Sequence, residues 1–301
     1  MMKKIFIMLC LILGVQSYGV SCDACGCLPG NMGFGLLTDY KVNYFRVSYF
    51  SSRFNSSTEH DHHNSSDRFQ LIDLSFRFSV KDFPRINFYG QLPYKFNDRM
   101  SGDKSNKISG LSDVSLGANY TLIKNRQLSS NSQLYLEAGI GLSMPTGKYD
   151  GDILNQNLPE NFNLGRGSFG YITQLNSVLN FKHFGVLWNN NLQINGKTNE
   201  GYLFGKQYST QLNAFKELDT KHVQIIPNFG LLYEQISRDK SADNYYVSET
   251  GGKGLFANVS LNFKTNSWLA GISISQPLAE NYSSGVIEAK GRAAIHFSIL
   301  F

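Results

Sequence analysis

The stretch KGRAAIHFSILF, residues Lys290–Phe301, indicates the fold class of this chain. Every second residue, counted back from the end, is apolar: Phe301, Ile299, Phe297, Ile295 and Ala293. The residues between them include Ser298, His296 and Arg292. A period of two with one apolar face is typical of a strand that touches hydrocarbon on one side and polar surroundings on the other. Both a transmembrane β-barrel and a soluble β-sandwich contain such strands.

The composition favours the barrel. Aromatic residues make up 13% of the 301 residues, and 28 glycines accompany only 7 prolines, which favours strands and tight turns. Charged residues make up 17%, whereas a soluble domain has about 25%. The mean hydropathy is nevertheless negative, which excludes a bundle of apolar helices. The net charge of +5 is modest and the basic residues are scattered, so no nucleic-acid partner is expected.

Residues 1–19 are expected to be a signal peptide. Lys3 and Lys4 provide the positive region, residues 5–15 form a short apolar run, and Ser17 and Gly19 supply small residues for cleavage. The apolar run is too short to span a bilayer, for which about 20 residues are needed. The mature chain is therefore expected to leave the cytoplasm.

Residues 20–39 are expected to form a Cys-rich segment that lies in the periplasm or plugs a barrel lumen. Cys22, Cys25 and Cys27 stand within six residues. An odd number of cysteines leaves open one disulfide with a free thiol, an intermolecular bridge, or a metal site. Three thiolates suit a soft ion such as Cu(I) or Zn(II). Lipidation of Cys22 is a further alternative, although residues 19–21 match a lipobox poorly.

Residues 40–301 are expected to form the barrel. Apolar and polar residues alternate over about twelve segments, near 40–50, 68–80, 86–96, 113–122, 134–144, 168–181, 186–195, 207–215, 223–236, 255–263, 268–276 and 290–301. Every second connection is long and polar, at 51–67, 97–110, 145–167, 196–206 and 237–254. Long external loops, short periplasmic turns and an even strand number are typical of outer-membrane barrels.

The predicted fold is therefore all-β: a single transmembrane antiparallel up-and-down β-barrel of about 12 strands in the cell outer membrane. The last strand must pair with the first, because lipid tolerates no open sheet edge. The aromatic end of the last strand resembles the C-terminal signal that the barrel-assembly machinery reads. That resemblance implies this machinery and outer-membrane lipid as partners.

A second resemblance lies in the middle of the chain. The run Ser109-Gly110-Leu111-Ser112-Asp113 and the run from Gly139 to Tyr149, with Pro-Thr-Gly-Lys at 145–148, are similar to the outer-membrane channel family associated with meta-cleavage degradation of phenols. The similarity spans residues 86–233 and implies a passive transporter or channel of a family that is itself similar to hydrophobic-substrate transporters. Ser112 departs from the family, which more often has glycine there. The Cys-rich head instead resembles that of some bacterial outer-membrane barrels of unassigned function.

The inward face of the predicted barrel is rich in amides, at Gln91, Asn119, Gln174, Asn176, Asn189, Asn191, Gln193, Gln211, Asn213, Gln224, Asn228, Asn258 and Asn262. The candidate lumen and selectivity residues are Asp73, Arg77, Lys95, Asp113, Glu137, Glu234, Arg292 and His296. Buried polar groups need water or one another. Twelve strands lie between the filled eight-stranded barrels and the open porins. The lumen is thus either a narrow channel or partly plugged, and Asp113 near the external mouth suits a gating charge.

The expected function is passive movement of small-molecule solutes through a polar-lined barrel. A first alternative is a metal-handling barrel that binds Cu or Zn through the cysteines and the external loop with His60, His62 and His63, because neighbouring histidines can share a metal. The simpler interpretation of that loop is a solvated segment. A second alternative is a structural or adhesion barrel with a filled lumen. No enzyme is expected, because nucleophile-elbow, zinc-protease and phosphate-loop motifs are all missing.

Overall fold

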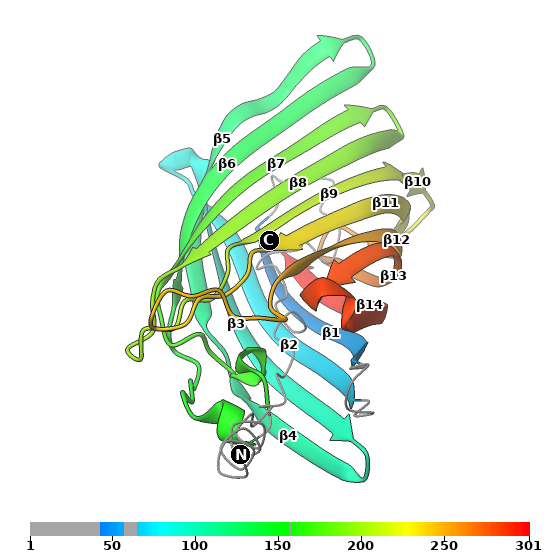
Figure 1. The fold of residues 1–301 in the computed structure, drawn as a ribbon. Coiled ribbons are helices and arrows are strands. Elements are labelled where there is room, and N and C mark those ends of the chain that lie inside the picture. Colours follow the sequence, from blue (N-terminus) through cyan, green and yellow to red (C-terminus); the bar gives the residue numbers. More distant parts are fainter. Residues whose placement is uncertain (1–42, 57–64, 157) are drawn as a thin grey trace, which may run out of the picture.

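The protein is an antiparallel sheet closed into a barrel (Figure 1), and its computed structural model describes residues 43–56, 65–156 and 158–301. The strands are β1 (Tyr44–Ser56), β2 (Ser65–Val80), β3 (Phe83–Ser101), β4 (Lys104–Leu111), β5 (Val114–Ser129), β6 (Ser132–Met144), β7 (Gly170–Phe181), β8 (Phe184–Asn195), β9 (Gln207–Lys216), β10 (Leu218–Asp219), β11 (Gln224–Ile236), β12 (Gly252–Lys264), β13 (Trp268–Tyr282) and β14 (Ile287–Leu300). Three short 3-10 helices accompany them, η1 (Ile153–Gln156), η2 (Glu160–Phe162) and η3 (Ser283–Gly285). Within these ranges, no helix has the length and hydropathy needed to cross a bilayer.

These segments make twelve barrel strands. Both β4 and β5 pair with β3, at its external and periplasmic halves respectively, so they are two parts of one strand. Likewise, β9 and β10 both pair with β11. The prediction of an antiparallel barrel of about 12 strands is confirmed.

The final strand closes the barrel, as the sequence pattern predicts. β14 pairs with β1 in a register that runs from Tyr44 opposite Leu300 to Ser56 opposite Ile287. This pairing satisfies the backbone hydrogen bonds of both strands, so the described sheet has no open edge facing lipid.

Alternate side chains of β14 face opposite environments. Phe297 is 48% exposed and Ile299 is 56% exposed on the outside, whereas His296 and Ser298 are 3% and 0% exposed on the inside. The inward face is not wholly polar, because Leu300 also points inward and is buried. The same outward apolar surface continues around the barrel and forms the band that contacts hydrocarbon.

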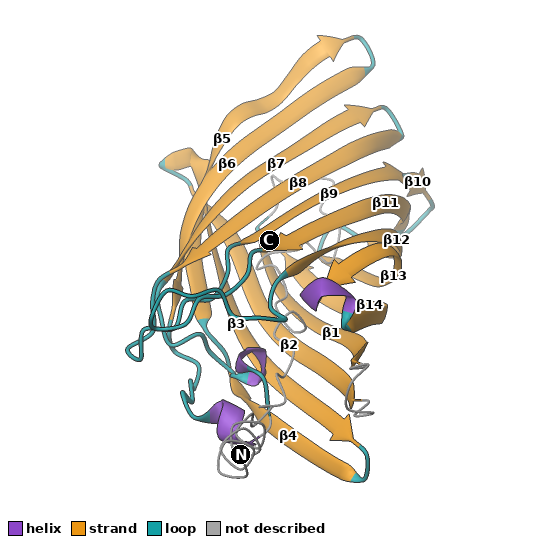
Figure 2. Ribbon diagram, viewed as in Figure 1, coloured by secondary structure: helices purple, strands orange, loops and turns teal. Residues whose placement is uncertain are grey.

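The two ends of the barrel differ in their connections (Figure 2). Residues 81–82, 130–131, 182–183, 220–223 and 265–267 make short turns at the end where β1 begins and β14 finishes. Residues 145–169, 196–206 and 237–251 make long connections at the other end. In outer-membrane barrels, short turns are periplasmic and long loops external. The end with the short turns is therefore the periplasmic end, and the end with the long connections is the external end.

Several strands extend further than the hydropathy pattern predicts, so their predicted boundaries are wrong. The predicted loop 97–110 is a protruding hairpin of β3 and β4, and the described residues of predicted loop 51–67 all belong to β1 and β2. Residues 124–129, which lie between the predicted strands 113–122 and 134–144, belong to the end of β5. Beyond the hydrocarbon layer both faces of a strand can be polar. The alternation on which the prediction rested then disappears, although the hydrogen-bond ladder continues.

A charge on the lipid-facing surface should be costly. Replacing Ile295, which is 54% exposed in the middle of β14, with arginine is expected to destabilise the barrel by about 2–4 kcal/mol. The matched control, Phe83→Arg at the periplasmic rim, should cost at most about 1 kcal/mol. Urea unfolding in lipid vesicles measures both values. Equal costs at the two positions would contradict the assignment of this face to hydrocarbon.

Candidate functional site

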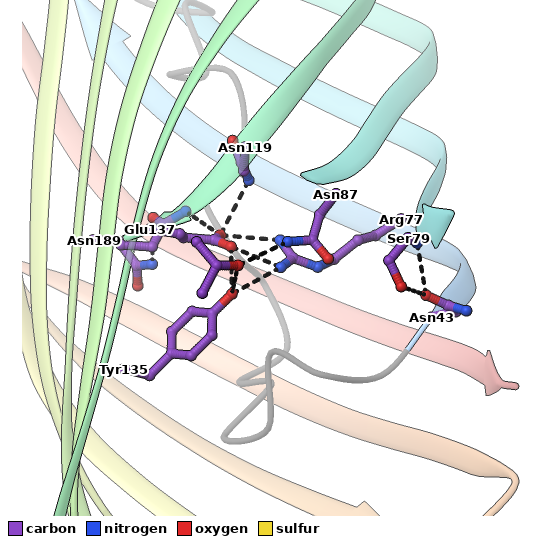
Figure 3. Close-up of polar contacts among 10 residues, drawn as sticks. Asn43, Arg77, Ser79, Asn87, Asn119, Tyr135, Glu137 and Asn189 are labelled. Atoms are coloured by element: carbon purple, nitrogen blue, oxygen red, sulfur yellow. Dashed lines mark hydrogen bonds and ion pairs between the residues drawn. The ribbon is translucent and has the colours of Figure 1, made fainter. Parts of the chain in front are cut away.

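The first polar cluster inside the barrel surrounds Glu137 of β6 (Figure 3). Arg77 of β2 donates two hydrogen bonds to its carboxylate, of 2.9 Å from Nη1 and 2.7 Å from Nη2. The Tyr135 hydroxyl donates a third at 2.7 Å, and the Asn119 and Asn176 amides donate at 3.0 Å each. Glu137 is fully buried and Arg77 is 4% exposed. Every oxygen of this carboxylate is therefore held by charge-assisted bonds.

A second cluster repeats this chemistry in the external half. Arg292 of β14 bonds both oxygens of Glu234 on β11, at 2.7 and 2.6 Å. The Tyr282 hydroxyl also contacts Glu234, and the Arg292 guanidinium lies 3.9 Å from the ring centroid of Phe256. The predicted lumen residues Arg77, Glu137, Glu234 and Arg292 are thus brought together as two buried pairs. Within each pair, the charges neutralise one another.

A third ion pair, which the sequence pattern did not predict, lies near the external end. Arg99 of β3 bonds the carboxylate of Asp67 on β2 at 2.7 and 2.6 Å. Both residues fell inside segments predicted to be loops. The alternation of each strand, extended beyond its predicted end, places both residues on the inward face. Arg99 lies an even number of residues from Lys95, and Asp67 lies an even number from Asp73.

The external segment 145–169 folds into the mouth of the barrel. Phe162 is completely buried, and its ring lies 5.0 Å from Phe69 of β2 and 5.0 Å from the Arg99 guanidinium. The Asn97 amide donates to the Phe162 carbonyl at 2.9 Å. Lys95 donates to the Leu164 carbonyl at 3.1 Å. This predicted lumen cation therefore anchors the segment to the wall.

Asp113 holds the base of the same segment. Its carboxylate accepts hydrogen bonds from the backbone N–H groups of Gly147 at 3.0 Å and Arg166 at 2.7 Å. The Arg166 side chain then reaches Asn195 of β8 at 3.0 Å and Gln207 of β9 at 2.7 Å. The predicted gating charge thus fixes the position of a segment at the mouth.

Acidic groups gather where the external segments pack together. Burial raises the pKa of Glu160 to about 7, and the negative charges of Asp239 and Glu200 add to the shift. Burial also raises the pKa of Asp239 to about 6, although the Gly205 N–H and the Tyr202 hydroxyl donate hydrogen bonds to it at 2.6 and 2.8 Å. The packing of these segments therefore favours the neutral form of both carboxyl groups.

Asp73 and His296 face the lumen from either side of β1, because each is opposite Ser48 in the strand register. Asp73 is half-buried, whereas His296 is 3% exposed. Neither ring nitrogen of His296 has a hydrogen-bond partner among the described residues.

The predicted amides line the lumen mainly on β7 to β12. Ten of those named above are at most 9% exposed: Asn119, Gln174, Asn176, Asn191, Gln193, Gln211, Asn213, Asn228, Asn258 and Asn262. The Asn189 amide donates to the Asn176 carbonyl oxygen at 2.8 Å, which links neighbouring strands. Gln91, Asn189 and Gln224 are only half-buried, so water reaches this surface.

The predicted metal ligands Cys22, Cys25, Cys27, His60, His62 and His63 lie outside the described residues. In the part of the chain that is described, no three histidine, cysteine, aspartate or glutamate side chains are grouped to hold a metal ion. Binding of Cu or Zn by these residues stays a prediction.

The sequence of the chain matches a family model over residues 38–276, which is most of the barrel. That family carries the description "Putative MetA-pathway of phenol degradation". This chain belongs to that family. The resemblance seen in the residues around Ser109–Asp113 and Pro145–Lys148 is thereby confirmed. No curated protein sequence matches the chain.

Solved structures share the barrel fold at low sequence identity. An outer membrane channel from Pseudomonas putida F1 has a TM-score of 0.64 and 16% identity, with 91% of this chain and 99% of that chain covered. The beta domain of the Bordetella autotransporter BrkA has a TM-score of 0.51 and 14% identity, with 86% and 100% covered. This barrel fold and its apolar outer band place the protein in the cell outer membrane.

Proposed function

We propose that this family member is an outer-membrane channel for passive movement of small solutes. The observation that carries the proposal is a set of partly exposed polar side chains that face the interior of an apolar-coated barrel, beside buried apolar clusters around Phe162 and Phe215. Inward-facing Asp73, Asn189 and Gln224 come from different strands and different heights, and each keeps part of its surface exposed. A water-lined path of this kind allows polar solutes to cross a layer that hydrocarbon otherwise closes to them.

The path is narrow on this proposal. The segment that carries Phe162 occupies the external mouth, and the two Arg–Glu clusters project from the wall below it. Small solutes are therefore the expected cargo, and a large open-pore conductance is not expected. The role is non-enzymatic, because the lumen supplies a path and a potential and does no bond chemistry.

Planar-bilayer recording of the purified full chain tests this proposal. Discrete current steps, small compared with those of sixteen-stranded porins, are the expected result. Protein-free bilayers and bilayers exposed to heat-unfolded protein serve as controls. If correctly folded protein inserts into the bilayer but passes no current and no solute, the channel proposal is wrong and the filled structural barrel replaces it.

A further inference from the structure

Two arginines face each other on the outer surface of the barrel, near its external end. Arg53 of β1 is directly opposite Arg68 of β2 in the strand register, and both side chains are exposed. The two strands are neighbours in the sheet (Figure 1). Residues directly opposite each other in an antiparallel pair have Cβ atoms about 5 Å apart, and like charges at such positions destabilise the sheet. The arginine pair is therefore unfavourable unless an anion binds beside it.

The carboxylates on the neighbouring strands are engaged elsewhere. Asp98 of β3 is opposite Arg68 in the register, but its carboxylate pairs with Lys107 of β4 at 3.9 Å. On the other side of β1, Glu288 of β14 pairs with Lys290. Neither arginine of the facing pair forms an ion pair with a residue that the structure describes. Two positive charges thus remain available to a ligand.

Neutral hydrogen-bonding groups flank the two arginines on the same face. In the register, Ser51 is opposite Gln70 on the periplasmic side of the pair, and Asn55 is opposite Ser66 on the external side. Alternate residues of a strand share a face, so these four side chains point outward with the arginines. We call the six residues the arginine patch. Guanidinium groups bind phosphate through two parallel hydrogen bonds, and hydroxyl and amide groups bond to sugar hydroxyls.

The arginine patch lies at the height of the lipid headgroups. Tyr49 of β1 is opposite Ile72 of β2, and this outward pair ends the apolar surface of both strands. Tyr94 and Phe96 of β3, opposite Ile72 and its neighbour Gln70, are exposed beside it. Outward aromatic residues mark the membrane interface of outer-membrane barrels. Both arginines stand four residues beyond the Tyr49–Ile72 pair, which is about 10 Å higher in a tilted strand.

We propose that the arginine patch binds a phosphate group of lipid A, the phosphorylated glycolipid in the outer leaflet of the outer membrane. The phosphate lies between the two guanidinium groups and removes their repulsion. The glucosamine hydroxyls bond to the flanking serine and amide side chains, and the acyl chains lie along the apolar band below. This inference rests on the location in the outer membrane and not on the channel function, because the patch is outside the lumen.

Native mass spectrometry of the folded full chain in detergent tests the proposal. Diphosphoryl lipid A is the probe, and cardiolipin, which also carries two phosphates, is the comparison lipid. The wild type should bind lipid A more tightly than cardiolipin. In the variant Arg53→Gln/Arg68→Gln, the affinity for lipid A should fall about fivefold for each arginine removed, as expected for a basic residue at an anionic lipid surface. The variant should fold, because it removes a like-charge contact, and its heat-dependent migration in gel electrophoresis checks this.

The matched control is Lys124→Gln/Arg126→Gln, which removes two positive charges from exposed positions at the periplasmic end of β5. It should leave the affinity for lipid A unchanged. The variant Arg53→Lys/Arg68→Lys keeps both charges of the patch but lacks the planar guanidinium donors. Its affinity for lipid A should be intermediate between those of the wild type and the glutamine variant.

Four results would overturn the inference. Equal lipid A affinity in the wild type and in Arg53→Gln/Arg68→Gln would show that the patch does not bind the lipid. An equal loss in Lys124→Gln/Arg126→Gln would show that net charge alone controls binding. Equal wild-type affinities for cardiolipin and lipid A would assign the patch to anionic phospholipids in general. Binding of inorganic phosphate as tight as that of lipid A would assign it to a free anion.

Discussion

Replacing Arg77 alone with methionine is expected to destabilise the barrel by about 3 kcal/mol, the lower end of the range for a broken buried ion pair. The variant leaves the Glu137 carboxylate buried without a counter-charge, since both groups are at most 5% exposed. The cost stays at the lower end because Tyr135, Asn119 and Asn176 still donate to that carboxylate.

The double variant Arg77→Met/Glu137→Met should recover most of the loss, because replacing both charges of a buried pair with apolar groups is often close to neutral. The ion pair of Lys107 and Asp98, 3.9 Å apart in the β3–β4 hairpin, is the control, because the Lys107 side chain is 74% exposed. Lys107→Met should change stability by less than about 1 kcal/mol. Denaturant unfolding in lipid vesicles measures all three variants. The interpretation fails if the double variant is as unstable as Arg77→Met alone.

Ion conductance is expected to rise between pH 5 and pH 8. Burial raises the pKa of Glu160 to about 7 and that of Asp239 to about 6, so both carboxyl groups are favoured as neutral in the packed external segments. The neutral carboxyl groups stabilise this packing. The stabilisation is complete below the ordinary carboxyl pKa, and it is lost as the pH rises through the raised pKa of each group. Above pH 7 the two carboxylates repel each other and Glu200, and the segments should loosen from the mouth.

The groups facing these two carboxyls limit the effect. Tyr149 and Asn163 hydrogen-bond Glu160, while Tyr202 and the Gly205 N–H bond Asp239. The positive charge of Arg166 also favours ionised Asp239, so Glu160 should dominate the transition.

The double variant Glu160→Gln/Asp239→Asn tests this interpretation, because it keeps both shapes and cannot ionise. The conductance of this double variant should stay at its low-pH value from pH 5 to pH 8. The control is Asp243→Asn, which removes an exposed acid from the external segment that carries Asp239. Its conductance should change with pH as that of the wild type does. A flat wild-type profile would rule out this role of the external segments. So would a conductance rise that survives in the double variant.

The sequence by itself determined the class of fold. Lipid contact and a polar lumen force opposite chemistry onto alternate residues, so runs such as Ile295–Ile299 show the strand, its lipid face and its place at the closure of the barrel. The same phase placed Arg77, Glu137, Glu234 and Arg292 inside. The alternation could not show which arginine pairs with which glutamate, because the two partners lie three barrel strands apart. The shear of the barrel decides which residues of such distant strands lie at the same height.

Only the tertiary structure decided what fills the mouth and where the strands end. Outside the hydrocarbon layer a strand is not required to alternate apolar and polar residues. The segments that contain Asp67 and Arg99 were therefore predicted as loops, although these two residues form a buried ion pair. The inward fold of residues 145–169 depends on contacts such as Asn97 with Phe162 and Asp113 with Arg166, between residues more than 50 positions apart in the sequence. Such contacts leave no periodic pattern, because they depend on three-dimensional proximity and not on a repeated environment.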